Sequence, residues 1–385
     1  DKKKGVPIVY ATVGVEGTSI GSITNQAGEF RLHLADSLRR KSLVFSHVGY
    51  MAQKIDIPLL TAGQHFTLTL EPRIFLLQEV VIRVVHPIRL MREMLEKRMI
   101  NYSQKPVYFT TFYREGVQYK QKFRSLTEAV FKIYKSPVQS LYAREQVKLL
   151  KMSRITDGLE QDTLIARMSG GIDACLQLDI INHLPDFLLA DAHKDVYAYT
   201  SADVTIVGDH LVNVISFEQK KEVKEPLYCG ELYIDSDNGA LLQAQIRIHP
   251  RYMKQATDMV VQRQARRMKI VLQELTYTIS YKPWNGTYYI NHVRGDLHFK
   301  VKQKRQWLGS SSLHTWFEMV TCKIDTVGVT RFQRNERIPT RTVFADTHFK
   351  YDSDFWENFN VIPWEKQLVE VIEQLTSKIE KIEYE

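Results

Sequence analysis

The stretch PIVYATVGVEGTSIGSITNQAGEFRL, residues 7–32, and the stretch LVFSHVGY, residues 43–50, decide the fold of the first part of the chain. Short apolar runs alternate in them with glycine-containing turns at regular spacing, which is typical of a small all-β sandwich. Phe30, Leu32 and Leu34 alternate with polar residues and are expected to share one face of a strand. The pattern predicts an architecture, and no residue in it points to a reaction.

Length and composition predict a globular protein of two or three domains. The chain has 385 residues, of which 44% are hydrophobic and 11% aromatic, so it can build a sizeable core. No apolar run approaches the roughly 18 residues that a membrane-spanning helix needs. The three cysteines lie far apart, which argues against a disulfide framework and against a cysteine-based zinc site.

The first part of the chain also carries a family resemblance. From residue 1 to about residue 83 it resembles the carboxypeptidase-like regulatory domain, which implies a prealbumin-like, Ig-like β-sandwich. This domain is widespread in Bacteroidota-type envelope proteins, including extensions of TonB-dependent outer-membrane transporters. The positions that carry the resemblance are Pro7, Tyr10, Ala11, Thr12, Val13, Gly17, Thr18, Gly21, Thr24, Asn25, Gly28, Phe30, Leu32, Ser46, Gly49 and Tyr50.

The resemblance implies a location and partners. It implies a place in the periplasm or at the outer membrane, with an envelope protein, a glycan or a lipid as partner; no signal peptide is visible in the chain. The family pattern has one more strand before the turn at residues 1–7. We therefore expect a sandwich that lacks its first strand, with an open edge beside residues 8–15.

The rest of the chain predicts a fold that is mainly β with α, in the α+β class. We expect a connecting helix and linker over residues 84–105, with a one-face helical stripe at 88–99. Residues 106–385 read as a larger, curved antiparallel sheet with packed helices, among them an insertion at about 158–195 and a C-terminal helix at about 363–382. Its Asn285-Gly286 turn is the strongest hairpin signal.

Two further resemblances concern this second part. Residues 112–115 and 126–129 resemble a block that follows the regulatory domain in a Bacteroidota-type family of uncharacterised proteins, and no known activity comes with it. The succession of hairpins loosely resembles the half-barrel of the LolA-like periplasmic lipoprotein carriers. That second likeness is one of architecture, which is weak evidence for function.

Positive charge gathers in clusters, and the net charge is +8. Lys300, Lys302 and Lys304 alternate along one predicted strand, and residues 263–269 hold four more cations. The plain interpretation is a solvated face, and the alternative is contact with an acidic lipopolysaccharide or polysaccharide. No helix-turn-helix, zinc-finger or RNA-binding signature accompanies the charge, which disfavours nucleic acid.

The sequence contains no complete catalytic motif in a suitable structural context. None of the twelve histidines begins the His-x-x-Glu motif of a zinc carboxypeptidase, so we expect no metal and no cofactor. Residues 17–21 match a Gly-x-Ser-x-Gly string, but strand signals flank them on both sides. Residues 235–239 resemble a calcium loop with its glycine one place early, so we interpret them as a hairpin turn. Glu115 and Glu128, on adjacent predicted strands, are the remaining candidate for a carboxylate pair.

Aromatic residues of the second part are the candidate ligand contacts. They either fill a large core or line a concavity between the sheet and the helical segment at 172–189, where an apolar or glycan ligand would bind. These candidates are Tyr108, Phe112, Tyr119, Tyr277, Tyr281, Tyr288 and Tyr289.

Three functions follow from these observations. The first is a non-catalytic envelope protein that binds or scaffolds through protein, glycan or lipid contacts. The alternatives are an unrecognised carboxylate-dependent hydrolase and a lipid or lipoprotein carrier with a LolA-like half-barrel. An enzyme should have a cleft with convergent ionisable groups, whereas a binding module should have a groove or an exposed apolar patch.

Overall fold

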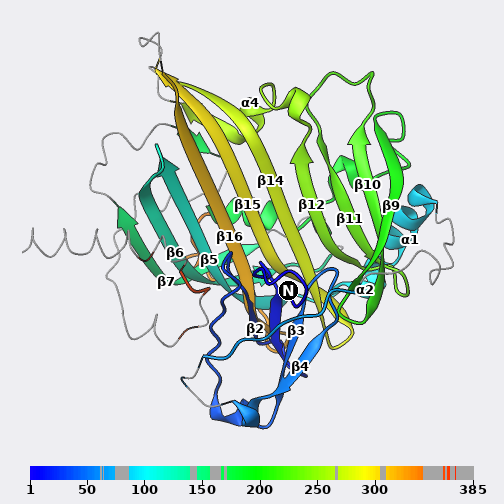
Figure 1. Ribbon diagram of the computed structural model, residues 1–385, viewed down its shortest axis with the longest axis vertical. Coiled ribbons are helices and arrows are strands. Elements are labelled where there is room, and N and C mark those ends of the chain that lie inside the picture. Colours follow the sequence, from blue (N-terminus) through cyan, green and yellow to red (C-terminus); the bar gives the residue numbers. More distant parts are fainter. Residues whose placement is uncertain are drawn as a thin grey trace, which may run out of the picture.

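The protein is mainly β and contains two sheets of very different size (Figure 1). A four-stranded sheet near the N-terminus packs beside a ten-stranded antiparallel sheet, and a two-stranded sheet completes the β structure of the described residues. The computed structural model describes residues 1–60, 63, 65–73, 86–138, 145–156, 166–168, 171–264, 268–303, 309–340, 359, 362–364 and 369.

The small sheet has the order β2-β1-β3-β4 and is antiparallel. Gly21 begins β2 at a close approach, because a Cβ atom there would lie 2.7 Å from the Val13 carbonyl oxygen. Short 3-10 helices, Asp36–Leu38 and Ile57–Leu59, precede β3 and follow β4. The strands are β1 Thr12–Val15, β2 Gly21–Ile23, β3 Ser42–Ser46 and β4 Gln53–Asp56.

The open edge expected beside residues 8–15 is wrong. β1 is an interior strand, since it pairs with β3 on one side and with β2 on the other, where Thr12 lies opposite Ile23. β2, which follows β1 in a hairpin, is the edge strand of the sheet. The strand expected at residues 29–34 does not form either, although Phe30, Leu32 and Leu34 alternate in burial as predicted and pack on the core.

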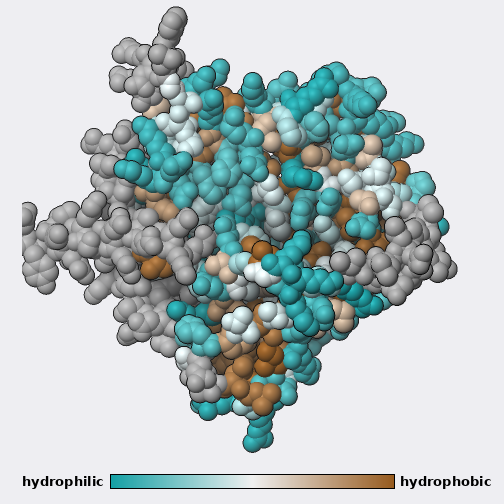
Figure 2. Space-filling view, in the orientation of Figure 1, coloured by the Kyte–Doolittle hydropathy of each residue, from teal (hydrophilic) through white to brown (hydrophobic). Residues whose placement is uncertain are grey.

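The apolar cluster of this N-terminal domain is only partly covered. Phe45 is 3% exposed and contacts the rings of Phe30 and Phe66 edge-on, at centroid distances of 5.4 and 6.4 Å. Phe66 itself is 37% exposed. Figure 2 accordingly shows hydrophobic surface gathered over the N-terminal domain, at the lower end of the view.

Phe45→Ala is expected to lower the free energy of unfolding by about 3–5 kcal/mol, the usual loss for a buried phenylalanine. Phe30→Ala should cost less, roughly 1–3 kcal/mol, because that side chain is only partly buried. Denaturant melts of the two variants give both values. The opposite order, or a loss below about 1 kcal/mol for Phe45→Ala, would show that Phe45 is not the centre of this core.

The large sheet has the order β7-β6-β5-β16-β15-β14-β12-β11-β10-β9. The hairpin predicted at Asn285-Gly286 is confirmed, because β14 and β15 meet there and both turn residues have positive φ. The bounds are β5 Val107–Tyr119, β6 Lys122–Lys135, β7 Gln146–Thr156, β9 Tyr197–Val207, β10 His210–Gln219, β11 Tyr228–Asp235, β12 Leu241–Ile248, β14 Met268–Trp284, β15 Thr287–Gln303 and β16 Ser311–Asp325.

Short helices pack against one face of the large sheet, called the inner face here, which includes Phe109 and Tyr113. The predicted helix at 88–99 is found as α1 Pro87–Glu96 followed by α2 Arg98–Asn101, with Pro87 in its first turn. The helix expected from residue 172 is shorter than predicted and is α3 Gly171–Gln177. Further along the chain, α4 Thr257–Val260 is followed by strand β13 Val261–Gln264, which pairs with β8 Ala166–Met168.

Other expectations fall outside the described residues. They are most of the C-terminal helix at 363–382 and part of the insertion at 158–195. Within the described ranges, no helix is long and apolar enough to cross a membrane. Cys175, Cys229 and Cys322 are free thiols.

The N-terminal domain packs on the opposite face of the large sheet, called the outer face here, which includes Phe112 and Arg114. Ile23 of β2 joins an apolar cluster with Phe112 and Val320. Ser19 Oγ donates to the Ile324 carbonyl at 2.9 Å and accepts from the Ile324 amide at 3.0 Å. Hydrogen bonds between backbone and side chains therefore fix the small sheet on β16.

Candidate binding groove and buried polar networks

The seven aromatic candidates divide between the two faces of the large sheet. Tyr108 and Phe112 lie on the outer face, where Tyr108 stacks on Phe332 at 5.3 Å and Phe112 belongs to the interdomain cluster. The other five pack in or against the inner-face core, and Tyr119 is the most exposed of the seven. The structure therefore does not bring the whole set together.

Three of the candidates surround a small internal cavity. Tyr281, Tyr288 and Tyr289 line it together with Tyr102, which the sequence did not single out. The cavity has a volume of about 30 Å³, which is room for one or two waters and far below the size of a ligand site. This placement favours the alternative that these tyrosines fill the core.

A buried ion cluster adjoins this cavity on the inner face. Lys135 Nζ lies 2.8 Å from Glu145 Oε1 and 2.7 Å from Asp179 Oδ2, and Tyr281 donates to the other oxygen of Asp179 at 2.9 Å. Burial alone would raise the pKa of the Glu145 carboxyl, but Lys135 and His183 hold that pKa below its ordinary value. The cluster joins β6 to the segment after α3, so it has a structural role.

The carboxylate pair proposed for a hydrolase does not form. Glu128 lies opposite Arg114 in the register of β5 and β6, and Glu115 lies opposite Thr127. Because successive side chains point to opposite faces of a sheet, Glu115 and Glu128 lie on different faces. Glu115 accepts from the Tyr113 hydroxyl at 2.6 Å on the inner face, where burial raises the pKa of its carboxyl.

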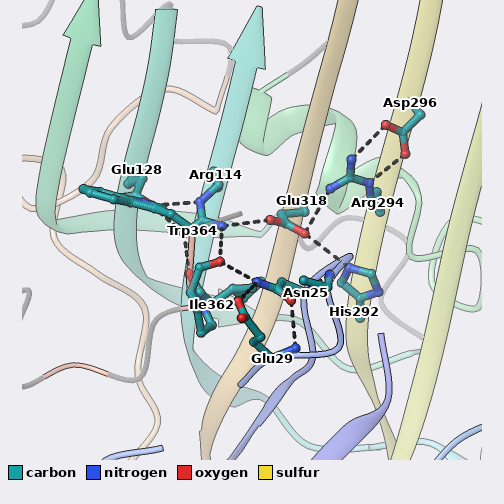
Figure 3. A network of polar contacts seen from close by, with 12 residues as sticks. Asn25, Glu29, Arg114, Glu128, His292, Arg294, Asp296, Glu318, Ile362 and Trp364 are labelled. Carbon is teal, nitrogen blue, oxygen red and sulfur yellow. Dashed lines mark hydrogen bonds and ion pairs between the residues drawn. The ribbon is translucent and has the colours of Figure 1, made fainter. Parts of the chain in front are cut away.

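The outer face carries a row of alternating charges across four neighbouring strands, shown in Figure 3. Glu128 of β6, Arg114 of β5, Glu318 of β16 and Arg294 of β15 lie directly opposite one another in register, and we call them the ion row. Arg114 Nη2 lies 2.7 Å from Glu128 Oε1, and Arg294 Nη1 lies 3.3 Å from Glu318 Oε2. These four side chains are at most 8% exposed.

The ion row holds a C-terminal segment, residues 362–364, against the sheet. Arg114 donates to the carbonyls of Ile362 and Pro363, and Trp364 Nε1 donates to Glu128 Oε1 at 2.7 Å. Asn25 of the N-terminal domain donates to the same Pro363 carbonyl at 3.2 Å. The row thus ties the N-terminal domain, the sheet and this segment into one interface (Figure 3).

Burial and ion pairing act in opposite directions on Glu318. Burial alone would raise the pKa of its carboxyl, but Arg294 and Arg114 keep that pKa below its ordinary value. Burial also lowers the pKa of His292, whose Nε2 atom lies 3.9 Å from Glu318 Oε2, too far for a hydrogen bond. The opposing effects of burial and pairing indicate that these groups are arranged for stability.

A groove of ligand size lies at the β9 end of the large sheet, between the segment that follows α3 and the loop joining β10 to β11. Its volume is about 430 Å³, within the range of roughly 300–1,000 Å³ that is usual for ligand pockets. Charged, imidazole and apolar side chains all contribute to its wall. The lining residues are Asp186, His193, Val196, Tyr197, Val223, Lys224, Glu225 and Leu227.

The floor of the groove is aromatic. Tyr197 is 4% exposed and contacts the ring of Phe217 at 6.2 Å, and Phe217 in turn stacks on Phe187 at 4.3 Å. Above it, Asp186 Oδ1 lies 3.5 Å from His193 Nε2. Burial, with the Asp186 charge nearby, raises the pKa of Tyr199, whose buried hydroxyl has no hydrogen-bond partner in the described part of the chain.

The loop that forms one wall of the groove is held in place. The side chain of Gln219 donates to the carbonyls of Val223 and Glu225 and accepts from the Leu227 amide at 3.0 Å. Tyr252 donates to the Val223 carbonyl at 3.1 Å. Because the loop is already ordered, less conformational entropy is lost when a ligand binds.

The sequence did not identify this groove. It lies beside the helical segment where a concavity was expected, but none of the seven aromatic candidates lines it. Its residues come from three separate segments and share no motif, so only the three-dimensional structure brings them together. The hairpin turn predicted at 235–239 is confirmed, because Asp235 Oδ1 accepts from the Asp237 amide at 2.8 Å and β11 pairs with β12 on either side. No cluster suited to a metal occurs in the ranges that the structure describes.

Comparison with known proteins identifies the N-terminal domain. Residues 1–82 match the family model of the CarboxypepD_reg-like domain, which confirms the resemblance found in the sequence. No curated protein matches the chain.

Solved structures with a similar outline cover mainly the remainder of the fold. One is a domain of a lipoprotein-sorting protein of the outer membrane from Vibrio parahaemolyticus, at 10% identity and a TM-score of 0.27, covering 63% of this chain and 94% of that one. Another is a DUF1329 family protein from Desulfovibrio piger, at 11% identity and a TM-score of 0.27, covering 64% and 96%. A LolA superfamily protein from Nitrosomonas europaea has 9% identity and a TM-score of 0.22, covering 62% and 94%. These TM-scores are too low to carry an argument about function.

Proposed function

We propose that the protein is a non-catalytic binding protein of the cell envelope whose ligand occupies the groove at the β9 end of the large sheet. The observation that carries this proposal is the groove itself, about 430 Å³ in volume with a fixed wall and a mixed lining. An aromatic base under charged rim residues suits a ligand with one apolar and one polar side, such as a segment of a partner protein or a glycan. The CarboxypepD_reg-like domain supports the envelope location through its resemblance to envelope proteins.

The described residues give less support to the two alternatives. A carboxylate-dependent hydrolase would need two convergent carboxylates, and Glu115 and Glu128 lie on opposite faces of the sheet. A carrier with a LolA-like half-barrel would need a large apolar cavity on the inner face. That face is packed with helices and tyrosines, and the cavity beside Tyr281 is only about 30 Å³.

Photo-crosslinking at the groove tests the proposal. A benzoylphenylalanine at position 224, in the groove lining, should give a discrete crosslinked product in intact cells, and mass spectrometry then distinguishes a protein from a glycan. The matched control is position 221, an exposed lysine of the same loop that does not line the groove. Equal products from both positions, or none from position 224, would contradict ligand binding in the groove.

A further inference from the structure

Three basic segments that are far apart in the sequence meet at one end of the large sheet. Lys269 of β14 lies directly opposite Lys302 of β15. Lys300 lies opposite Ser312 of β16, and the Ser312 carbonyl accepts from the amide of Lys120, in the turn between β5 and β6. The topology therefore gathers Lys120, Lys269, Lys300 and Lys302 at a single end.

The three segments that carry these cations contain no acidic residue. The sequence windows 118–125, 263–271 and 299–312 contain no Asp or Glu. Lys269, Lys300 and Lys302 are exposed and make no ion pair within the described parts of the chain. Like charges directly opposite one another in a sheet are unfavourable, so this arrangement is relieved by an anionic partner.

The shape of this end fits a flat partner. β14 and β15 are 17 residues long, whereas the neighbouring β12 has 8, so the long hairpin extends beyond the rest of the sheet. Figure 1 shows its end, with the start of β16, projecting at the top of the molecule. On the inner face of this end, Ile270, Phe299 and Val301 are buried in the core, so the hairpin packs against the rest of the domain.

We propose that this basic end docks on an anionic lipid surface, whose phosphate groups face Lys120, Lys269, Lys300 and Lys302. These four cations are lysines, which act as point charges and do not form the bidentate contacts by which arginine recognises nucleic acids. Lysines close to an anionic bilayer each strengthen binding by roughly fivefold. The inference concerns a surface distinct from the groove, so either proposal can fail without the other.

Vesicle co-sedimentation of the full chain tests this docking. The wild-type protein should bind phosphatidylglycerol-containing vesicles at low salt and dissociate from them at high salt. It should not bind phosphatidylcholine vesicles. Lys300→Glu/Lys302→Glu should weaken binding at least about twentyfold. The matched control is Lys3→Glu/Lys4→Glu, which makes the same change of net charge at exposed positions of the N-terminal domain; it should retain most of the binding.

Three results would overturn the inference. They are no wild-type binding to the acidic vesicles, equal losses in the two double variants, and tighter binding of the same lysines to duplex DNA than to vesicles. The substituted lysines are exposed, so unchanged thermal unfolding should accompany both variants and exclude misfolding as the cause.

Discussion

Replacing Arg114 with methionine is expected to lower the free energy of unfolding by about 3–5 kcal/mol, the usual cost of leaving a buried charge without its partner. The guanidinium lies 2.7 Å from Glu128 and 3.6 Å from Glu318, and both carboxylates would remain buried after the change. Its hydrogen bonds to residues 362 and 363 would also be lost. Urea unfolding at neutral pH measures the loss.

The matched control is Arg92→Met. Arg92 makes a two-point contact with Asp191 at 2.9 and 2.8 Å, but both side chains are more than half exposed, so the loss should stay below about 1 kcal/mol. A double variant, Arg114→Met/Glu128→Leu, should recover part of the stability because it also removes one of the orphaned carboxylates. A loss for Arg114→Met no larger than that of Arg92→Met would show that the ion row does not hold the interface.

Lys135→Met is expected to have a similarly large effect, about 3–5 kcal/mol, on the inner face. Lys135 lies within 2.8 Å of both Glu145 and Asp179, and its side chain is 6% exposed. Without the ammonium, the two buried carboxylates lose the cation that lies between them, although His183 remains near Glu145 and Tyr281 remains bonded to Asp179. The change should not alter ligand binding, because none of these residues lines the groove.

The cost of Lys135→Met should depend on pH. In the folded wild-type protein, Lys135 and His183 hold the pKa of Glu145 below its ordinary value against the effect of burial. A depressed folded pKa contributes stability that is present above the unfolded value of about 4.3 and is lost as the pH falls through the folded pKa. In the variant, Lys135 no longer opposes the effect of burial, which favours the protonated acid.

The difference in stability between wild type and Lys135→Met should therefore be largest near pH 7 and smaller near pH 4. Urea unfolding at both pH values checks this expectation. A difference that stays constant between them would show that Lys135 does not govern the ionisation of Glu145.

Much of the β architecture could be predicted because its signals are local. Asn285-Gly286 favours a tight hairpin through its own backbone preferences, and the structure has β14 and β15 on either side of it. The alternation of Phe30, Leu32 and Leu34 correctly gave their common side, but not whether a neighbouring strand pairs with them. Strand pairing in this domain depends on where β2 lies beside β1 in the folded structure, and the local sequence pattern does not determine that position.

The position of side chains on one face or the other could not be predicted where a strand is buried on both sides. In β5, Phe112 and Tyr113 are both fully buried, so the alternation of polar and apolar residues carries no information there. The register of β5 and β6 places Glu128 opposite Arg114 and Glu115 opposite Thr127, so the two glutamates are not paired. The groove was missed for a related reason, since Asp186, Tyr197 and Leu227 belong to segments with no shared pattern.

Native mass spectrometry of the full chain, isolated from its own cells without denaturant, tests the central claim most directly. The groove account predicts a ligand mass bound one to one on the wild-type chain. That mass should be largely lost in Lys224→Glu/Glu225→Lys, which exchanges the two exposed charges of the groove and leaves the net charge unchanged. A chain that carries no ligand, or a ligand that the exchange does not affect, would contradict the assignment of this groove as the binding site.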